Sequence, residues 1–512
     1  MEALQIRYFN RPFPKQNMSV TVIGAGFGGL SAAALLGKEG YDVTLLEKNS
    51  QPGGRARVLR DQGYSFDMGP SWYLMPDVFE NFFKEFDKKP EDYYKLLRID
   101  PSYRIFFDGE QITDVSGDLE ENYVLFDSFE EGGGDKLRRY LEQAEHHYRL
   151  AMDEMLYREY DRIWDLFSGK LALEGFKLPL FSNIDGYVSK WFKSSKAKKI
   201  LEYSIGFIGG SPHNTPALYY IMNHVDFKLG VWYPAEGGIG RVVSALEDLC
   251  KDYSVDIKYD HEVTKLEAQG KNVTKVVTAD ETFTPDIVVV NADYPHTELN
   301  LLESKYRTYD EKYWASKTMA PSALVLYIGL DKKLPKMEHH NLFLTKDWDK
   351  GFENIFDPKK ASWPETPSYY INITSKYDTT TAPEGGESIF VLVPLAPDLV
   401  DTPEIREKYY DKLVTHIEEL AGEPIKGHEV VKHIYAVNDY KKDYNAYKGT
   451  ALGLTHSLLQ TAIFRPSHKS KKLDNLYYTG HYTHPGIGMP MCLISSQVLT
   501  KTIAKRHKGE PT

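Results

Sequence analysis

The sequence predicts an α/β fold in which a Rossmann-like domain with a parallel sheet carries an inserted domain of helices and strands. A strand, a glycine turn, a helix and a second strand follow one another from residue 20. A further apolar run at residues 287–290 has the length of a buried strand, and long helical and strand-like stretches surround it. Because 512 residues exceed what one hydrophobic core usually holds, we expect more than one domain.

The composition is that of a folded globular protein, with 42% hydrophobic and 26% charged residues. A formal net charge of −11 argues against a nucleic-acid partner, which would need a basic surface. Cys250 and Cys492 lie far apart and match no metal-ligand spacing, so we expect free thiols and no metal site. Residues 1–17 lack the apolar centre of a secretory signal and are expected to form a disordered leader of a cytoplasmic protein.

The amino-terminal pattern begins with the β-branched run at residues 20–23 and continues, after several glycines, into the strong helix formers of residues 30–36. A second strand-like run, residues 43–46, ends at Glu47. A strand, a helix and a strand in this order form the unit from which parallel sheets are built.

The glycines between the first strand and the helix fit the pattern G-x-G-x-x-G. Gly24 permits the tight turn, Gly26 lets the backbone approach a diphosphate, and Gly29 allows the helix to pack closely on the strand. The helix that starts near Phe27 and Gly28 offers free backbone N–H groups to the phosphates. This context predicts a dinucleotide site.

Glu47 lies near the spacing of about 20 residues at which an acidic side chain accepts hydrogen bonds from the ribose. An acidic residue here favours an unphosphorylated ribose, and therefore FAD or NAD over NADP. The stretch at residues 51–57 then decides for FAD, because Gly54 and Arg55 can wrap the same diphosphate from its other side.

Residues 20–57 resemble the flavoproteins with a double-glycine signature, which include amine oxidases, carotenoid desaturases and Rab dissociation inhibitors. The resemblance extends to residues 234–241, to a strand whose Val263 backbone would meet the adenine, and to Asp293, in a segment that would return towards the flavin. Only one dinucleotide fingerprint is present, so no second nicotinamide cofactor is expected.

Near the carboxyl terminus a predicted strand ends at Gly480, which would let backbone lie against the ribityl chain of FAD. The next helix is expected to start at about Met489, just after Gly488, and to stabilise the negative charge of the reduced flavin. His481 stands where many relatives carry Asp, and its role is open between a polar contact and a loop cap. His484 is expected to fix the loop by hydrogen bonding rather than to act as a base.

Residues 444–466, the Thr-His-Pro-Gly stretch at 483–486, and residues 211–216 and 230–234 are similar to bacterial and fungal phytoene desaturases, over nearly the whole chain. The resemblance implies an FAD-dependent carotenoid desaturase acting on an acyclic or monocyclic carotenoid, of the phytoene type or at the 3,4-bond of a hydroxycarotenoid. Hydride would leave an allylic carbon, a weak base would suffice for the proton, and the pocket would be a long apolar tunnel. The alternatives are a carotenoid isomerase or saturase that uses FAD, and a prenyl-binding protein of the Rab dissociation-inhibitor type.

The expected cofactor-binding residues are Gly24, Gly26, Phe27, Gly28, Gly29, Glu47, Lys48, Gly54, Arg55, Val263, Asp293, Gly480, Gly488 and Met489. No catalytic side chain is assigned. The expected domains are a discontinuous FAD-binding domain at 18–100, 230–300 and 465–507, a helical substrate and membrane-docking region at 101–229, and a β-rich substrate domain at 301–464.

The substrate expected from the resemblance is lipid-soluble, and residues 181–200 are a candidate landing site on a membrane. This stretch places Tyr187, Trp191 and Phe192 among five lysines, as an interfacial helix would, although a solvated lysine face has the same pattern. We expect peripheral association with the inner face of the cell membrane, and electron transfer to a quinone or to oxygen.

Overall fold

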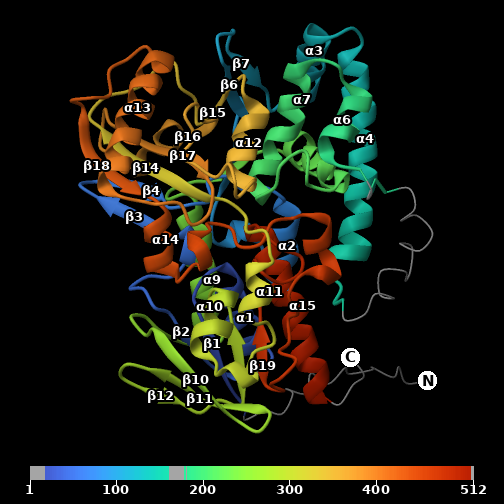
Figure 1. The fold of residues 1–512 in the computed structure, drawn as a ribbon, viewed down its shortest axis with the longest axis vertical. Coiled ribbons are helices and arrows are strands. Elements are labelled where there is room, and N and C mark those ends of the chain that lie inside the picture. Colours follow the sequence, from blue (N-terminus) through green and yellow to red (C-terminus); the bar gives the residue numbers. More distant parts are fainter. Residues whose placement is uncertain (1–17, 161–177, 180–181, 509–512) are drawn as a thin grey trace, which may run out of the picture.

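The computed structural model describes residues 18–160, 178–179 and 182–508. Its lower half in Figure 1 is built on a parallel sheet, and its upper half on a larger mixed sheet. The chain passes between the halves several times, as the sequence predicts for a Rossmann-like domain with an inserted domain.

The parallel sheet joins strands that are far apart in the sequence. Its order is β19-β13-β1-β2-β9, and every neighbouring pair is parallel. Parallel strands covered on both faces are apolar throughout, which explains the Ile-Val-Val-Val sequence of the fourth of these strands in the chain. The strands are β1 (Ser19–Ile23), β2 (Asp42–Leu46), β9 (Asp256–Lys258), β13 (Ile287–Val290) and β19 (Leu476–Tyr478).

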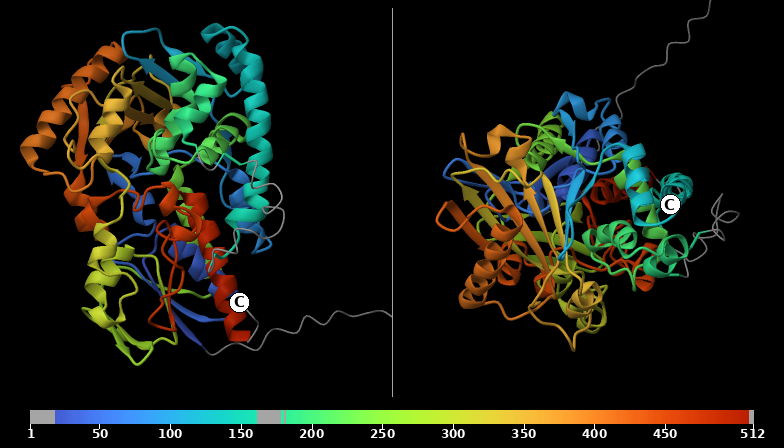
Figure 2. Two further views of the ribbon diagram at one scale, coloured as in Figure 1. Left: turned by 45° about the vertical axis from the view of Figure 1, so that its right-hand side comes forward. Right: turned by 90° about the horizontal axis from the view of Figure 1, so that it is seen from above.

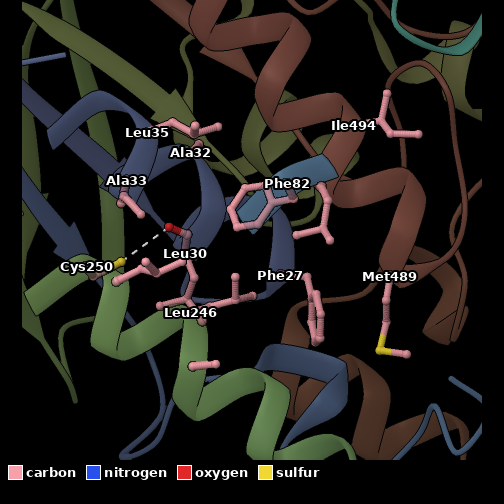
Figure 3. Packing of buried hydrophobic residues seen from close by; sticks show 14 of the residues in the cluster. Phe27, Leu30, Ala32, Ala33, Leu35, Phe82, Leu246, Cys250, Met489 and Ile494 are labelled. Atoms are coloured by element: carbon pink, nitrogen blue, oxygen red, sulfur yellow. Dashed lines mark hydrogen bonds between the residues drawn. The ribbon is translucent and has the colours of Figure 1, made fainter. Parts of the chain in front are cut away.

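Three helices pack together on one face of this sheet: α1 (Phe27–Lys38), α9 (Ile239–Asp252) and α15 (Met489–Lys508). The alanines of α1 are fully buried, so its backbone can approach both neighbours closely. Figure 3 shows this core, in which the Cys250 thiol donates to the carbonyl oxygen of Leu30 at 3.3 Å. Cys250 and Cys492 are both free thiols, as expected.

The other face of the parallel sheet packs against an antiparallel sheet and a cluster of aromatic rings. Tyr294 stacks on Tyr478 with 3.7 Å between ring centroids, and Tyr478 donates to the buried carboxylate of Glu298 at 2.7 Å. The antiparallel sheet consists of β10 (Val263–Gln269), β11 (Asn272–Thr278) and β12 (Thr282–Phe283).

The upper half contains a seven-stranded mixed sheet in the order β18-β14-β17-β16-β15-β6-β7. Helix α13 (Pro403–Ala421) covers its outer face, and helix α4 (Gly133–Ala151) runs along the opposite side of the molecule (Figures 1 and 2). The strands are β6 (Tyr103–Phe107), β7 (Thr113–Val115), β14 (Ser322–Leu330), β15 (His340–Leu344), β16 (Tyr369–Ile373), β17 (Glu387–Leu395) and β18 (Glu429–Tyr435).

Strands β6 and β7 lie in the region 101–229, for which the sequence predicted helices. Strand β6 pairs in parallel with β15 of the β-rich region, from Arg104 opposite Asn341 to Phe107 opposite Leu344. Three of the five side chains of β6 are buried in succession. The sequence of this short strand therefore lacks the alternation of apolar and polar residues by which a strand is recognised. The seven-stranded sheet is therefore assembled from both expected regions.

Helices occupy most of the remainder of this region. The long helix α4 (Gly133–Ala151) continues as a π-helical turn, η3 (Met152–Leu156). The neighbouring elements are α3 (Leu119–Phe129), α6 (Ile184–Trp191), α7 (Ser195–Glu202), η6 (Tyr203–Ile208), η7 (Ala217–Ile221), α8 (Met222–His224) and η8 (Val225–Leu229). The shorter elements elsewhere are β3 (Val58–Asp61), β4 (Tyr64–Asp67), α2 (Pro76–Lys84), β5 (Leu96–Arg98), β8 (Trp232–Pro234), α10 (Tyr294–His296), α11 (Glu311–Ala315), α12 (Trp348–Phe356) and α14 (Val437–Tyr444).

The lysine-rich stretch does not form the interfacial helix that the sequence suggested. Residues 184–202 form two short helices, α6 and α7, and the side chains of Tyr187 and Phe192 are buried in the core between the helices. Lys196 and Lys198 form ion pairs with Glu110 and Asp185. The aromatic rings therefore pack inward, and this prediction of a landing site is wrong. Phe181, where the predicted stretch began, lies outside the described residues.

Candidate active site

One long cavity runs between the two halves of the molecule. Its lower part is lined by the first glycine loop, by the ends of β2 and β13, and by the loop before α15. Its upper part lies under the seven-stranded sheet and is mostly apolar, with Phe207, Ile208, Ala323, Leu342, Leu344 and Leu392 on its wall. The same space thus connects polar backbone at one end with hydrocarbon at the other.

The two glycine loops from opposite ends of the chain lie against each other. A Cβ atom on Gly28 would lie 3.0 Å from the Cα atom of Gly480 and 2.5 Å from the Oδ1 atom of Asn291. Gly24 has φ +97°, a backbone conformation that residues with a side chain rarely adopt. Space for a Cβ is therefore absent where the loops meet, and Asn291 fills the gap between them.

The double-glycine stretch packs on the first loop. The backbone N–H of Gly53 donates to the carbonyl oxygen of Ala25 at 2.8 Å, and a Cβ on Gly54 would lie 3.1 Å from the Cα atom of Gly26. Arg55 follows with its Nε atom buried and without a hydrogen-bond partner, although it lines the cavity. An unpaired buried guanidinium N–H fits an anionic group in the cavity, such as a diphosphate.

Glu47 is held at the edge of the cavity by the chain around it. Its Oε2 atom accepts from the backbone N–H of Ala25 at 2.7 Å, and its Oε1 atom accepts from that of Asn49 at 2.8 Å. The Oε1 atom also accepts from the side-chain Nδ2 of Asn49 at 2.8 Å, so Oε2 is the oxygen that keeps a lone pair for a further donor, such as a ribose hydroxyl. Lys48 instead pairs with Glu262 at 3.1 Å, beside Val263 at the start of β10.

Asp293 has a structural role next to the cavity. Its Oδ1 atom accepts from the backbone N–H of His296 at 3.0 Å and so caps α10, while its Oδ2 atom accepts from the hydroxyl of Tyr482 at 2.8 Å. Burial raises the pKa of this carboxyl above its usual value. Asp293 thereby ties the end of β13 to the late glycine loop.

Arg465 supports the late glycine loop from behind, without lining the cavity. Its guanidinium donates to the carbonyl oxygens of His481 at 2.6 Å, Thr483 at 3.2 Å and Gln460 at 3.0 Å. Among the described residues no carboxylate lies within ion-pair distance of it, and burial lowers its pKa to about 10. A cation without a counter-ion therefore lies directly under the loop.

The two histidines of the late loop differ in their contacts. His484 directs Nε2 at the carbonyl oxygens of Met155 and Leu156, at 3.2 and 3.1 Å, which confirms its expected role in fixing the loop. His481 lines the cavity, and its buried Nε2 atom has no partner. Burial holds the pKa of His481 well below its usual value, so a neutral ring nitrogen faces the cavity.

The upper cavity wall contains one hydrogen-bonded chain of polar side chains. The Ser71 and Tyr370 hydroxyl oxygens are 2.8 Å apart, and the Tyr370 hydroxyl lies 2.6 Å from His340 Nδ1. Trp72 stacks on the His340 ring at 4.2 Å between centroids. The two hydroxyls and His340 Nδ1 are satisfied by this chain, whereas Trp72 Nε1 and His340 Nε2 are buried without a hydrogen-bond partner.

The fold and the site agree with the comparisons to known proteins. The family described as flavin containing amine oxidoreductase matches residues 27–497. The chain belongs to this family. It is therefore an FAD-dependent oxidoreductase, and the glycine cradle and the unpaired Arg55 donor fit that cofactor.

The carotenoid desaturases are among its relatives. The chain is 46% identical over 480 residues to a carotenoid 3,4-desaturase of Haloarcula japonica, covering 93% of this chain and 96% of the relative. It is 31% identical to a zeta-carotene-forming phytoene desaturase of Myxococcus xanthus, with 95% and 94% covered. An oxidoreductase of Methanosarcina mazei shares the fold, with TM-score 0.60, 15% identity, and 94% and 100% covered.

The structure brings most of the expected cofactor-binding residues to the lower cavity. The sequence did not point to three polar side chains that the structure places next to the site: Asn291 between the loops, Arg465 behind the late loop, and Asp226 bonded to the cavity-lining Tyr203. Arg465 gave a weak signal, as a lone charge after the apolar Ala462–Phe464 turn. The sequence around Asp226 gave none.

Proposed function

We propose that this protein is an FAD-dependent carotenoid desaturase, which removes a hydride and a proton from adjacent carbons of an acyclic or monocyclic carotenoid. The observation that carries the proposal is the continuous cavity, which has a dinucleotide cradle at one end and an apolar wall at the other. Such a cavity suits a hydrocarbon chain whose reacting bond is brought to the cofactor. The Haloarcula japonica relative is named a carotenoid 3,4-desaturase, so the 3,4-bond of a carotenoid is the first bond to test.

The residues of the lower cavity would hold FAD as follows. Glu47 would accept from the ribose, Arg55 would pair with the diphosphate, and the Val263 backbone would meet the adenine. Gly480 would give the ribityl chain room, and the first turn of α15 at Gly488 and Met489 would face the flavin. The remaining expected residues, Gly24, Gly26, Phe27, Gly28, Gly29, Gly54, Lys48 and Asp293, would shape or support this cradle.

FAD supplies the acceptor for the hydride, and the chain's own residues supply the surroundings. The apolar wall excludes water, and a cation formed on the polyene is spread over its conjugated bonds. The reduced cofactor would pass its electrons to a quinone or to oxygen. Product formation under anaerobic conditions with and without added quinone separates these acceptors.

The first expected result concerns the product spectrum. Purified protein that retains yellow FAD, given phytoene, lycopene or a 1-hydroxycarotenoid in liposomes, should yield a product that absorbs at longer wavelength, because desaturation lengthens the conjugated system. An unchanged conjugation length with altered double-bond geometry would indicate an isomerase, and a shortened one a saturase. Colourless protein that binds prenyl chains would instead favour the Rab dissociation-inhibitor type.

We further propose that the protein binds to the inner face of the cell membrane, from which a carotenoid would enter the cavity. None of the described helices is both long and apolar enough to cross a bilayer. Three large apolar side chains are nevertheless exposed within seven residues: Leu458 by 43%, Leu459 by 68% and Phe464 by 44%. A cluster of this kind on the surface is typical of an interaction site.

The backbone under these side chains is held by polar contacts next to the cavity. Gln460 binds the backbone of Thr318 through both ends of its side chain, at 2.9 and 2.8 Å. Thr461 lies 2.9 Å from the hydroxyl of Tyr219, which lines the cavity. The apolar tips are therefore presented outward by a rigid base, as insertion into a lipid headgroup layer requires.

Replacing Leu458 and Leu459 by serine should weaken binding to phosphatidylglycerol vesicles by about tenfold, since losing two inserted leucines costs more than about 1.4 kcal/mol. Vesicle flotation measures the binding. Val400→Ser is the matched control, because Val400 is exposed by 71% but lies on the helix α13 side of the upper sheet. Equal flotation of both variants would contradict the assignment of this surface.

A further inference from the structure

Two tyrosine hydroxyls meet a single buried carboxylate beside the upper cavity. The hydroxyls of Tyr103 and Tyr203 both donate to the Oδ2 atom of Asp226, at 2.9 and 3.0 Å. Asp226 is 3% exposed, and its Oδ1 atom has no hydrogen-bond partner. A carboxylate that is buried with a free oxygen is costly to the fold, so it calls for a physical reason.

None of the cationic side chains that the structure describes forms an ion pair with this carboxylate. Among the described residues, no Lys, Arg or His lies within ion-pair distance of Asp226, and the titratable groups that face it are the two hydroxyls. Tyr103 comes from β6 and Tyr203 from η6, while Asp226 is carried by η8. Burial raises the pKa of Asp226 to about 7, and the two hydrogen bonds oppose that shift.

The two tyrosines are not equivalent with respect to the cavity. Tyr203 lines it together with Trp72 and Phe207, at centroid distances of 6.1 and 5.5 Å, whereas Tyr103 does not line it. Tyr203 therefore connects the cavity to the carboxylate, and Tyr103 holds the carboxylate from behind.

Two segments link this cluster to the cofactor end of the cavity. Helix η6 begins at Tyr203 and ends next to Gly209, where a Cβ atom would lie 3.3 Å from Ile487 in the late glycine loop. Trp72 comes three residues after Gly69, and both residues line the cavity. A Cβ atom on Gly69 would lie 2.5 Å from the carbonyl oxygen of Arg55 in the cofactor cradle. The cluster thus borders the part of the cavity between the cradle and the apolar wall.

We infer that Tyr203 and Asp226 together accept the proton that leaves the carotenoid, an inference that rests on the proposed function. The hydride departs to FAD, and the C–H bond on the adjacent carbon then breaks, with its electron pair forming the new C=C bond. Its proton passes to the Tyr203 oxygen, while the original Tyr203 proton passes to Asp226. The carboxylate ends as a carboxylic acid, and the phenol is unchanged.

The pKa values of Tyr203 and Asp226 suit the removal of a proton from a cationic polyene. Burial raises the pKa of Tyr203 well above its usual value, so the phenol does not ionise by itself and needs the carboxylate behind it. An acceptor whose pKa lies near the working pH is efficient in proton transfer. Asp226 acts through Tyr203 and is a positioning residue as well as the final acceptor.

The test compares three variants of the FAD-loaded protein: Tyr203→Phe, Tyr103→Phe and Asp226→Asn. Each tyrosine variant removes one hydroxyl that donates to the same oxygen, so the pair is matched in chemistry and differs in access to the cavity. We expect Tyr203→Phe to lower kcat about 10²-fold, the usual scale of proton-transfer catalysis, and Tyr103→Phe to lower it less than about tenfold. Similar losses in both tyrosine variants would overturn the inference.

The pH profile of kcat is the second readout. Because the ionised carboxylate is the active form, kcat of the wild type should fall as pH drops below about 7, the pKa given by burial. Asp226→Asn should abolish this acidic limb, whereas a merely structural role would leave it in place. Retention of the limb in the Asn variant overturns the inference, and absence of any desaturated product from the wild type would overturn the proposed function instead.

Stability supplies an independent check that does not need turnover. The folded-state pKa of Asp226 is raised above the unfolded value near 4, so its ionisation opposes folding. This penalty is absent below pH 4 and is complete above pH 7. The free energy of unfolding of Asp226→Asn, relative to wild type, should therefore increase between pH 4 and pH 7, and a flat difference would contradict the buried, ionisable carboxylate.

Discussion

Gly28→Val should yield a folded but colourless protein. A side chain at this position would occupy the contact between the two glycine loops, where a Cβ alone would lie 2.5 Å from the Asn291 Oδ1 atom. The loops must separate to make room, and the cradle for the diphosphate opens with them. Each 1.4 kcal/mol of lost binding free energy weakens FAD binding tenfold. We therefore expect FAD to be lost during purification and turnover to fall to background.

The visible absorbance of the purified variant measures its FAD content, and circular dichroism establishes that it is folded. Gly270→Val is the matched control, since no atom lies within 4 Å of a Cβ at Gly270, in the hairpin between β10 and β11. Gly270 has a positive φ of 62°, so valine there adds a backbone strain that Gly28, in helix α1, does not have, and the control is the more demanding one for the backbone. A yellow Gly28→Val protein would show that the two loops do not enclose the cofactor.

The early dinucleotide site could be predicted because local rules determine it. A turn with φ +97° at Gly24, a close approach at Gly26 and an acidic residue after β2 are each tied to a residue type and a spacing. The α15 start at Met489 was predicted for the same reason, since a glycine loop followed by a helix leaves its mark in the sequence. The resemblance to double-glycine flavoproteins then placed the early and late motifs at one cofactor.

The substrate half was less predictable because its contacts join distant segments. Strand β6 finds its partner β15 more than two hundred residues later, and no local pattern reveals that pairing. Tyr187 and Phe192 were misread because aromatic residues among lysines have the same pattern in an amphipathic core helix and in an interfacial one. The direction in which a helix turns its apolar face depends on its tertiary neighbours.

Asp226 and Asn291 escaped prediction because their roles arise from burial. Asp226 carries no motif, and only the folded chain shows that two hydroxyls and no cation surround it. Asn291 lies two residues before Asp293, but its place between three glycines becomes visible only when Gly26, Gly28 and Gly480 converge. Spacing rules cannot supply such information, since they describe one segment at a time.

Arg465→Met should both destabilise the protein and make its bound FAD harder to reduce. The guanidinium donates to carbonyl oxygens on the loop that closes the cofactor cradle, including those of His481 and Thr483. Leaving several buried carbonyl groups unpaired costs about 1–3 kcal/mol each, so the free energy of unfolding should fall by several kcal/mol. Denaturant unfolding of the purified variant measures this loss.

The effect on reduction follows from charge. Reduction places negative charge on a bound flavin, and the Arg465 cation under the loop would favour it, in the same sense as the amino terminus of α15 would. Removing the charge should shift the reduction equilibrium at least tenfold towards the oxidised form, which corresponds to about 30 mV for a two-electron couple. Equilibration with a reference dye measures the potential.

Two further variants separate the charge from the hydrogen bonds. Arg465→Lys keeps the cation but loses the fork of donors, so its potential should stay near that of the wild type while its stability falls. Arg406→Met removes an arginine that pairs with Asp401 at 2.6 Å on the upper half, and it should change stability without changing the potential. If the Lys and Met variants of Arg465 have the same potential, the residue acts on the loop through geometry alone, and the electrostatic role assigned to its charge is wrong.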